Sequence, residues 1–334
     1  MRLAKLLPAL LCSLGLLLSA AGSAQAQSAT TAPARQQEAT AIVVPYAPGG
    51  PLDISARALA DALKDAIGPT IVHNRPGAGG NIGLGQVARS AADGKTLGVG
   101  AVATLAINPW LYAQMPYDAQ SAFEPVSPIA RVPNVLVMNA QRAKALNIGS
   151  LQDLIAYGRK NPGKLNYGSG GNGSAGHLAG ELFKRMGELD AVHVPYNGAS
   201  PAQLALLSQE VDFNFDNLAA ASANIRSGKL IALAVTTLEA SELLPGVPPM
   251  AQSLPGFAVD TWWGLVAPAG TPAEQVRTLN QAVTQALQSP ALRSQLQALS
   301  ATPFTASPEQ FKHFIETERQ RYQGIVQAAG ARID

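Results

Sequence analysis

A proline- and glycine-rich stretch at residues 45–51 has the composition of a main-chain anion site. It follows an apolar run, residues 41–44, that predicts a strand, and it precedes an amphipathic pattern that predicts a helix. The N-terminus of a helix carries free N–H groups and the positive end of the helix dipole, so it favours a small anion. Gly49 and Gly50 would let a ligand approach the backbone closely.

A second glycine-rich stretch, residues 168–174, also lies between a predicted strand and a predicted helix. Gly171, Gly173 and Gly176 match the G-x-G-x-x-G spacing of dinucleotide-binding loops. The acidic residue expected about 20 positions later is Asp190, which precedes the next predicted strand and does not end it. We therefore interpret this stretch as a glycine-rich helix N-terminus, and hence as a second anion site, in preference to an NAD(P) site.

Ser174 and His177 would share one face of a helix, which is a spacing that a hydrolase could use. The nucleophile-elbow pattern is absent, because Asn172 stands where that turn needs glycine. We favour a helix N-cap followed by a polar helical residue. The four histidines show no close ligand spacing and the lone cysteine, Cys12, falls in an N-terminal export signal. The sequence therefore predicts no metal site and no catalytic residue.

Three other polar residues come at the ends of predicted strands and are candidates for a cleft. Tyr46 and Tyr196 each follow a proline at a strand end. Residues 212–216 imitate a calcium loop, but they lack the glycine and the glutamate that such a loop needs. Their aromatic alternation predicts a strand instead, and it ends at Asp216, on the sheet edge where α/β proteins bind ligands.

These stretches need a scaffold of alternating strands and helices. The first part of the chain follows a βαβαβ rhythm, which predicts a parallel sheet, and then a strand-to-loop edge at residues 103–109. After a second set of strands and helices, a strand at residues 259–267 brings the chain back. Beyond it we expect three helices and no new strand, opened by Thr271, Ser289 and Ser307, each of which precedes a proline.

The first 26 residues, 1–26, predict a cleaved signal peptide. A basic start precedes an apolar run at residues 6–18, which is short for a transmembrane helix, and Ala24-Gln25-Ala26 forms a cleavage site. Residues 27–40 are small and polar, so we expect a disordered linker there. The sequence thus predicts a soluble protein that is exported by cleavage near Ala26.

Composition argues against several classes of partner. The chain has 24 Lys and Arg residues and 22 Asp and Glu residues, and the two basic residues of the signal peptide account for the excess. A neutral chain without basic runs argues against nucleic acid or an anionic membrane surface. Without Cys12 the exported chain has no disulfide, so its core must hold it together, and its length is sufficient for two lobes.

Several motifs, in this order along the chain, resemble one protein family. They are Val-Pro-Tyr-Ala-Pro-Gly-Gly (44–50), Asn-Arg-Pro-Gly-Ala-Gly-Gly-Asn-Ile-Gly (74–83), Ala-Ile-Asn-Pro (106–109), Asn-Pro-Gly-Lys-Leu-Asn-Tyr-Gly-Ser (161–169), Val-Pro-Tyr (194–196) and Leu-Val-Ala-Pro-Ala-Gly-Thr-Pro (265–272). The chain is similar, over about residues 40–330, to the Bug family, the TctC-like extracytoplasmic solute receptors of tripartite tricarboxylate transporters. The joint order of the motifs makes the resemblance specific.

The resemblance implies an α/β fold of the two-lobed periplasmic-binding-protein type (type II), in which two Rossmann-like lobes close like a flytrap on a cleft. Lobe 1 would comprise residues 41–134 with 262–334, and lobe 2 residues 135–261. In the family, one carboxylate is held between the lobes largely by backbone amides, small hydroxyls and ordered waters. Carried over to this chain, the binding residues would be Tyr46, Ala47, Pro48, Gly49, Gly50, Ala103, Thr104, Ser169, Gly170, Gly171, Asn172, Ser174, His177, Tyr196 and Asp216. The chain departs from the family at Pro51-Leu52, where Gly-Thr is common, and this removes a backbone donor and a hydroxyl.

We therefore expect a periplasmic solute-binding protein for a small organic carboxylate, with no cofactor and no enzymatic activity. Its partners would be the membrane permease subunits of a tripartite tricarboxylate transporter, or a sensor protein, and it would be a monomer. Two alternatives come from other classes. One is an enzyme, either a Ser174/His177 hydrolase or a dinucleotide-dependent oxidoreductase, and the other is a ligand-free scaffold.

Overall fold

The computed structural model describes residues 39–333. The predicted signal peptide lies outside the described residues, as does all but the end of the predicted linker, whose last residue, Thr40, begins the first strand. Among residues 39–333, no helix is long and apolar enough to cross a membrane.

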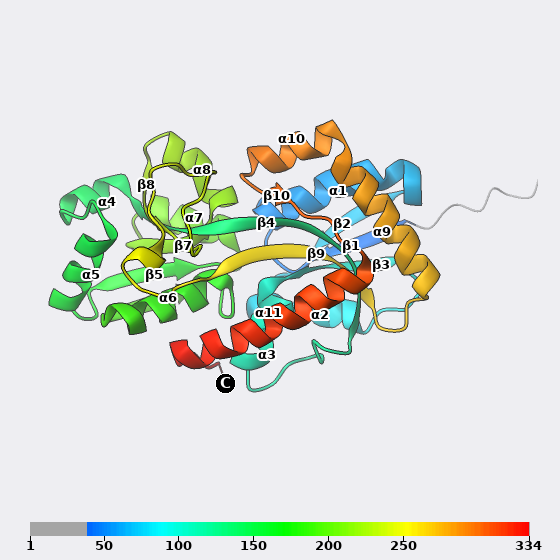
Figure 1. Ribbon diagram of the computed structural model, residues 1–334, viewed down its shortest axis with the longest axis horizontal. Helices are drawn as coiled ribbons and strands as arrows, with labels where there is room; N and C mark the ends of the chain where they lie inside the picture. The colour runs from blue at the N-terminus through cyan, green and yellow to red at the C-terminus, as the bar shows by residue number, and fades with distance from the viewer. Residues whose placement is uncertain (1–38, 334) are drawn as a thin grey trace, which may run out of the picture. The chain divides into compact units, whose positions relative to one another are not determined.

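One mixed sheet of ten strands organises the described part of the chain (Figure 1). The strands are β1 (Thr40–Val44), β2 (Thr70–Asn74), β3 (Thr96–Ala101), β4 (Phe123–Asn139), β5 (Leu165–Ser169), β6 (Ala191–Pro195), β7 (Phe213–Asn217), β8 (Leu230–Val235), β9 (Asp260–Pro268) and β10 (Thr302–Pro303). Their order in the sheet is β2-β1-β3-β9-β4-β7-β5-β6, and β8 and β10 pair with β4 beside this path.

Helices pack on both faces of this sheet. They are α1 (Pro51–Ile67), α2 (Asn81–Ala88), α3 (Asn108–Leu111), α4 (Ala140–Ala145), α5 (Leu151–Lys160), α6 (Ala175–Gly187), α7 (Ala199–Leu207), α8 (Leu218–Arg226), α9 (Ala273–Gln288), α10 (Pro290–Ala298) and α11 (Pro308–Ala329). Successive side chains of a strand point to opposite faces. In β1, Val43 packs in one apolar cluster, whereas Ile42 and Val44 pack in another. A sheet buried on both faces is typical of α/β proteins.

The parallel pairing expected from the βαβαβ rhythm is confirmed. β1 pairs in parallel with β2 and with β3, and β5 pairs in parallel with β6 and with β7. Parallel strands end at the same edge of a sheet, so the loops that follow them, and the helices that those loops open, gather along that edge.

β4 and β9 run antiparallel and link the two halves of the sheet (Figure 1). β4 pairs with β9 as far as Pro133 and with β7 from Asn134 onward. Side chains tie the strands at this point, because Asn134 Nδ2 donates to Val259 O at 3.2 Å and Thr261 Oγ1 donates to Asn134 Oδ1 at 2.9 Å. We call Pro133, Asn134 and residues 259–261 the strand crossing.

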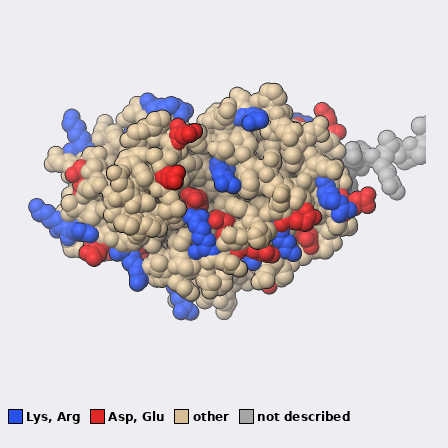
Figure 2. Space-filling view, in the orientation of Figure 1, with Lys and Arg blue, Asp and Glu red and all other residues tan. Residues whose placement is uncertain are grey.

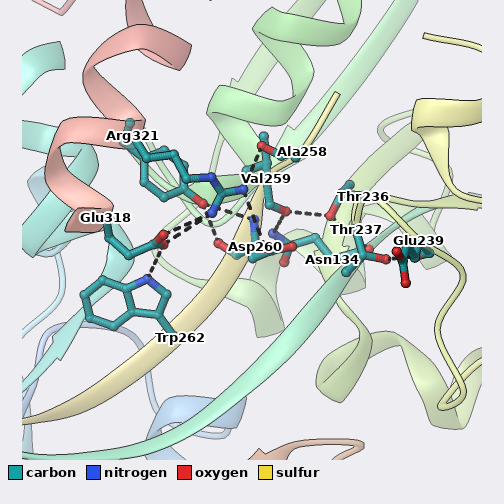
Figure 3. A network of polar contacts seen from close by, with 11 residues as sticks. Asn134, Thr236, Thr237, Glu239, Ala258, Val259, Asp260, Trp262, Glu318 and Arg321 are labelled. Atoms are coloured by element: carbon teal, nitrogen blue, oxygen red, sulfur yellow. Dashed lines mark hydrogen bonds and ion pairs between the residues drawn. The ribbon is translucent and has the colours of Figure 1, made fainter. Parts of the chain in front are cut away.

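The C-terminal helix α11 holds the strand crossing from one side. Tyr322 OH accepts from Asp260 N at 3.0 Å and donates to Asp260 O at 2.8 Å. Figure 3 shows Arg321 between Glu318 and Asp260. Arg321 Nη1 lies 3.1 Å from Glu318 Oε1, and Arg321 Nη2 lies 3.6 Å from Asp260 Oδ2. The indole of Trp262 donates to Glu318 Oε2 at 2.8 Å. Both polar groups of the Asp260 backbone therefore have partners on a helix from a distant part of the chain.

Two sequence expectations are wrong in detail. Residues 103–109 do not form a strand-to-loop edge; they form a π-helical turn (Ala103–Ile107) that runs into α3. Thr104 Oγ1 accepts from Ala101 N and donates to Ala101 O, both at 3.1 Å, and these bonds turn the chain at the end of β3. The short strand β10 also follows residue 267, where no further strand was expected, and it pairs with β4.

The predicted N-caps of the tail are confirmed at two positions of three. Ser289 and Ser307 cap α10 and α11, and Ser307 forms a capping box with Gln310. Helix α9 begins after Pro272, and the hydroxyl of Thr271 instead donates to Pro268 O at 2.8 Å. Thr271 therefore closes the turn that follows β9.

Candidate functional site

Several helices begin around one cavity of about 70 Å³. The residues from helix starts are Gly50, Pro51, Leu52 and Asp53 at α1, Ser174, Ala175 and Gly176 at α6, Gly198 and Ala199 at α7, and Asn217 at α8. The first N–H groups of a helix have no intrahelical acceptor, and each helix dipole places positive potential at its start. Main-chain donors from α1, α6 and α7 therefore surround the cavity, while Asn217 N at the start of α8 donates to Asp216 Oδ1, and the arrangement favours a small anion.

Most of these helix starts have no side-chain cap. Gly50, Gly198 and Asn217 make no side-chain hydrogen bond to the helices that they precede in the described structure. Ser174 does cap its helix, since its Oγ accepts from His177 N at 3.1 Å. No Lys, Arg or His is among the described residues that line the cavity, so the backbone supplies its positive potential.

A buried carboxylate fixes the loop that opens α1. Asp53 Oδ2 accepts from Gly49 N at 2.8 Å, and its Oδ1 accepts from Asn74 Nδ2 and Arg57 at 2.9 Å each. Burial raises the pKa of Asp53, but the bonds from Arg57, Gly49 and Asn74 outweigh it, so the pKa lies below its ordinary value. Asn74 Nδ2 also donates to Tyr46 O at 3.0 Å. The amide of Gly49 is thus already paired within the loop.

Seven of the predicted binding residues line this cavity. They are Tyr46, Ala47, Gly50, Ala103, Gly170, Ser174 and Asp216. Three more, Gly171, Asn172 and Tyr196, line a neighbouring cavity of about 360 Å³ that shares Tyr46 and Gly170 with the first. The structure therefore brings ten of the fifteen predicted residues to two adjoining cavities.

The other five predicted residues, Pro48, Gly49, Thr104, Ser169 and His177, do not line either cavity. The Thr104 hydroxyl is fully buried on Ala101. Ser169 Oγ lies 2.7 Å from His193 Nε2, and the His177 ring stacks on His193 with 4.2 Å between centroids. Ser169 and His177 support the second glycine-rich loop, because Ser169 Oγ bonds to the main chain of Gly171 and His177 Nδ1 accepts from Gly173 N.

The Ser174/His177 pair does not have the geometry of a nucleophile and its base. Ser174 Oγ bonds to the main chain of His177, and Nδ1 of the His177 ring accepts from Gly173 N at 3.2 Å. Burial lowers the pKa of His177 to about 4 and that of His193 to about 3, so both rings are neutral at neutral pH. A neutral ring whose Nδ1 already accepts a hydrogen bond is a structural support for the loop.

Asp216 lies at the cavity with few partners. Its side chain is buried, its Oδ1 accepts from Asn217 N at 2.8 Å, and its Oδ2 receives a long bond of 3.4 Å from Gln203 Nε2. Burial outweighs both bonds and raises the pKa of Asp216 to about 7. Burial thus brings the pKa of this carboxyl close to neutral pH.

Two hydrogen bonds join the two halves of the sheet across the cavities. Ala47 N donates to Asn197 O at 3.0 Å, and Tyr112 OH donates to Asn172 O at 2.9 Å. Each bond pairs a loop of the first half with a loop of the second. The cavities are thus bounded by both halves.

Some lining residues of the smaller cavity were not among the predicted ones. They are Pro51, Leu52, Asp53, Ala101, Val102, Asn134, Ala175, Gly176, Gly198, Ala199, Phe215, Asn217 and Thr261. Most are neighbours in sequence of predicted residues and could have been found by extending each strand end into the next helix. Asn134 and Thr261 carry no such signal, because they come from the middle of the sheet.

Comparison with known proteins decides the family. The model of the TctC family, described as the tripartite tricarboxylate transporter family receptor, matches residues 55–331. The chain belongs to this family. Protein BugT of Bordetella pertussis is similar to this receptor, with 39% identity over 327 residues that cover 97% of this chain and 98% of that protein. The resemblance to the Bug family is therefore confirmed.

Solved structures are similar to this receptor along most of its length. The structure described as R. palustris Rpa4515 with adipate has a TM-score of 0.83 and 36% identity, over 88% of this chain and 98% of that chain. MatC (Rpa3494) from Rhodopseudomonas palustris with bound malate has a TM-score of 0.81 and 32% identity, over 86% and 99%. The two-lobed α/β fold of periplasmic binding proteins is thus confirmed, and the chain is a solute-binding receptor of a periplasmic family and not an enzyme.

Proposed function

We propose that this receptor captures a small organic carboxylate between its two lobes, at the cavity where α1, α6, α7 and α8 begin. The observation that carries the proposal is that four helix starts line the cavity, that α1, α6 and α7 offer main-chain N–H groups there, and that no described lining residue has a cationic side chain. A compact carboxylate group matches such a site, because its oxygens can accept several N–H bonds at once. The cavity of about 360 Å³ beside it would hold the rest of the ligand.

The relatives support the chemical class of the ligand. One similar structure holds adipate and another holds malate, and both molecules carry two carboxylates. On this chain the fifteen predicted residues would make up the site, with those that line the two cavities in contact with the ligand and the others supporting the loops. Pro51 lacks an N–H, so the donors at the start of α1 begin with Leu52.

The lobe boundaries belong to the same proposal. Lobe 1 would comprise residues 41–134 with 262–334 and lobe 2 residues 135–261, so the chain would pass between lobes at the strand crossing. The change of partner along β4, from β9 to β7 at Asn134, supports a boundary there.

Export and partners follow from the family. We propose that the chain is exported by cleavage near Ala26, acts as a monomer in the periplasm and delivers its ligand to membrane permease subunits or to a sensor protein. On the face shown in Figure 2, acidic and basic side chains are interspersed, without a continuous patch of one sign. Such a surface does not favour nucleic acid, whose binding needs a concentrated positive field.

The test is calorimetric titration of the purified receptor with succinate, malate, adipate, citrate, benzoate and aspartate, together with thermal unfolding in the presence of each. We expect at least one acid to bind and to raise the unfolding temperature, because a ligand that binds only the folded state stabilises it. Heat and thermal shift absent with every acid would rule out the proposed function.

A single-donor variant tests the main-chain mechanism. Ala175 is the first residue of α6, where proline is well tolerated, and Ser174 already has an extended backbone with φ −66° and ψ 158°. Ala175→Pro thus removes one N–H from the cavity, and we expect affinity to fall by about 1.5–3 kcal/mol, as for a hydrogen bond to a charged group. The matched control is Ala273→Pro at the first residue of α9, far from the cavity lining, and it should bind as the parent does.

A further inference from the structure

The cavity that would receive the anion also contains a carboxyl with no countercharge. Two acidic residues line it, Asp53 and Asp216. Asp53 is neutralised by Arg57 at 2.9 Å, whereas no ion pair involves Asp216 among the described residues. Asp216 is also only 5% exposed, so water does little to stabilise its charge.

The elements around Asp216 offer no charge that would compensate it. α7 contributes Gln203, whose Nε2 has its shorter bond, 2.7 Å, to Ala220 O. The only charged residue of α8 is Arg226, at the far end of that helix, and β4 places Val135 opposite Asp216 in the sheet. On α6 the first titratable side chain is His177, which stacks on His193.

The lobe-1 side of the cavity is equally poor in free charge. The titratable groups there are Asp53, which is paired with Arg57, and the phenol of Tyr46, whose OH donates to Gly79 O at 3.4 Å. An anionic ligand would therefore share a small cavity with an ionised carboxylate unless one of them were protonated. Two carboxylates at such close range are stabilised by sharing one proton.

We propose that Asp216 takes up one proton from solvent when the anionic ligand binds, and that the resulting carboxylic acid donates a hydrogen bond to the ligand. This inference rests on the proposed function. A protonated carboxyl adds an O–H donor beside the main-chain N–H groups of the helix starts. It also lets the site accept an anion without repulsion from its own acidic residue.

In the ligand-free protein, protonation of Asp216 requires little free energy. Because burial raises the pKa of Asp216 to about 7, little free energy separates its charged and neutral forms at neutral pH. A nearby ligand anion raises the pKa further, since a like charge disfavours ionisation. Above about pH 7 the affinity should then fall by up to about tenfold per pH unit, because binding is coupled to the uptake of a proton whose concentration falls tenfold per pH unit.

The experiment is calorimetric titration between about pH 6.5 and 8.5, where simple dicarboxylates are largely ionised. The probes are succinate, malate, adipate and aspartate, and each pH is measured in two buffers of different ionisation enthalpy, which gives the number of protons taken up. We expect uptake to approach one proton per ligand at the upper end of this range, and affinity to fall as the pH rises. Asp216→Asn should take up no proton, and its affinity should not depend on pH.

The control variant is Asp260→Asn, because Asp260 also has a pKa raised by burial but lies at the strand crossing and not at the small cavity. This variant should keep the proton uptake of the parent. Binding with no pH dependence would overturn the inference and leave the proposed function intact, whereas no binding by any probe would remove both. Aspartate binding far more tightly than succinate, without proton uptake, would also overturn it, since Asp216 would then be an ionised acceptor for the ammonium group.

Discussion

The small cavity and the strand crossing meet at Thr261, but they differ in how fully their polar groups are bonded within the protein. Thr261 lines the small cavity and also a larger one of about 540 Å³ beside the crossing. At the cavity, three helices begin without a side-chain cap and Asp216 has no countercharge. At the crossing, the backbone of Asp260 is bonded on both sides by Tyr322, and Glu318 has Trp262 and Arg321 as partners.

The difference indicates which region changes partners during function. Buried polar groups cost free energy unless they are bonded, so donors left open at the cavity favour a bound ligand, which would satisfy them. At the crossing, both main-chain groups of Asp260 are satisfied within the protein, and the described residue atoms there that lack a partner belong to the side chain of Asp260. We therefore expect the crossing to be the fixed point about which the two halves move, and the cavity to be the region that opens and closes.

Removing the side-chain contacts that hold the strand crossing should have the largest effect on the free energy of unfolding. Glu318 is buried, and its loss leaves the Trp262 indole N–H without its acceptor and Arg321 without its closer ion-pair partner. We expect Glu318→Ala to lower the free energy of unfolding by about 3 kcal/mol, the lower end for breaking a buried ion pair, because Arg321 is partly exposed. Urea unfolding followed by circular dichroism measures this loss.

The control for this variant is Gln320→Ala, an exposed position on the same helix, which should change stability by no more than about 0.5 kcal/mol. Equal stabilities of the two variants would show that the Glu318 contacts are dispensable. The crossing would then not be a region whose internal bonds are essential for stability.

The two buried histidines near the second glycine-rich loop should make the free energy of unfolding depend on pH. His177 and His193 are neutral in the folded protein, with burial lowering their pKa values to about 4 and about 3 from an ordinary value of 6.5. Between pH 6.5 and 4 the unfolded chain binds protons at these positions that the folded chain does not, so stability falls as the pH falls. For His177 alone the loss between about pH 7 and pH 5 should be about 2 kcal/mol.

Urea unfolding at these two pH values compares the parent with His177→Gln, which cannot titrate. Asp216 acts in the opposite direction, because its raised pKa makes the folded state the one that holds the proton, but it is present in both proteins and cancels in the difference. His313→Gln, at an exposed position of α11, is the control and should keep the pH dependence of the parent. A parent and His177→Gln with the same pH dependence would contradict the buried neutral ring.

Local signals in the sequence located most of this architecture. Glycine, proline and apolar runs mark where each strand ends and each helix begins, and the cavity is built from such junctions, so residues such as Gly50, Gly170 and Ser174 could be predicted. The order of several motifs identified the family where no single motif could. The position of such junctions rests on interactions between near neighbours in the chain.

Long-range contacts explain what the sequence did not reveal. Asn134 and Thr261 lie 127 residues apart and meet only because β4 and β9 pair in the sheet. The role of Glu318 depends on Trp262, 56 residues earlier, and neither residue type signals the other. The turn at residues 103–107 depends on how the Thr104 hydroxyl bonds to Ala101, a choice between local hydrogen bonds that residue types alone do not decide.

The smallest expected effect is at the contact that joins the two halves across the cavities. Tyr112 OH donates to Asn172 O at 2.9 Å, and burial raises the pKa of Tyr112 to about 12, so the phenol remains a donor. Tyr112→Phe removes this bond, but water can reach a carbonyl at the edge of a cavity, so the net loss is about 1 kcal/mol. Ligand affinity should thus fall about fivefold, measured by titration with whichever acid binds the parent, while Tyr157→Phe on α5 should leave it unchanged. An affinity equal to that of the parent would mean that ligand binding does not depend on this bond between the two halves.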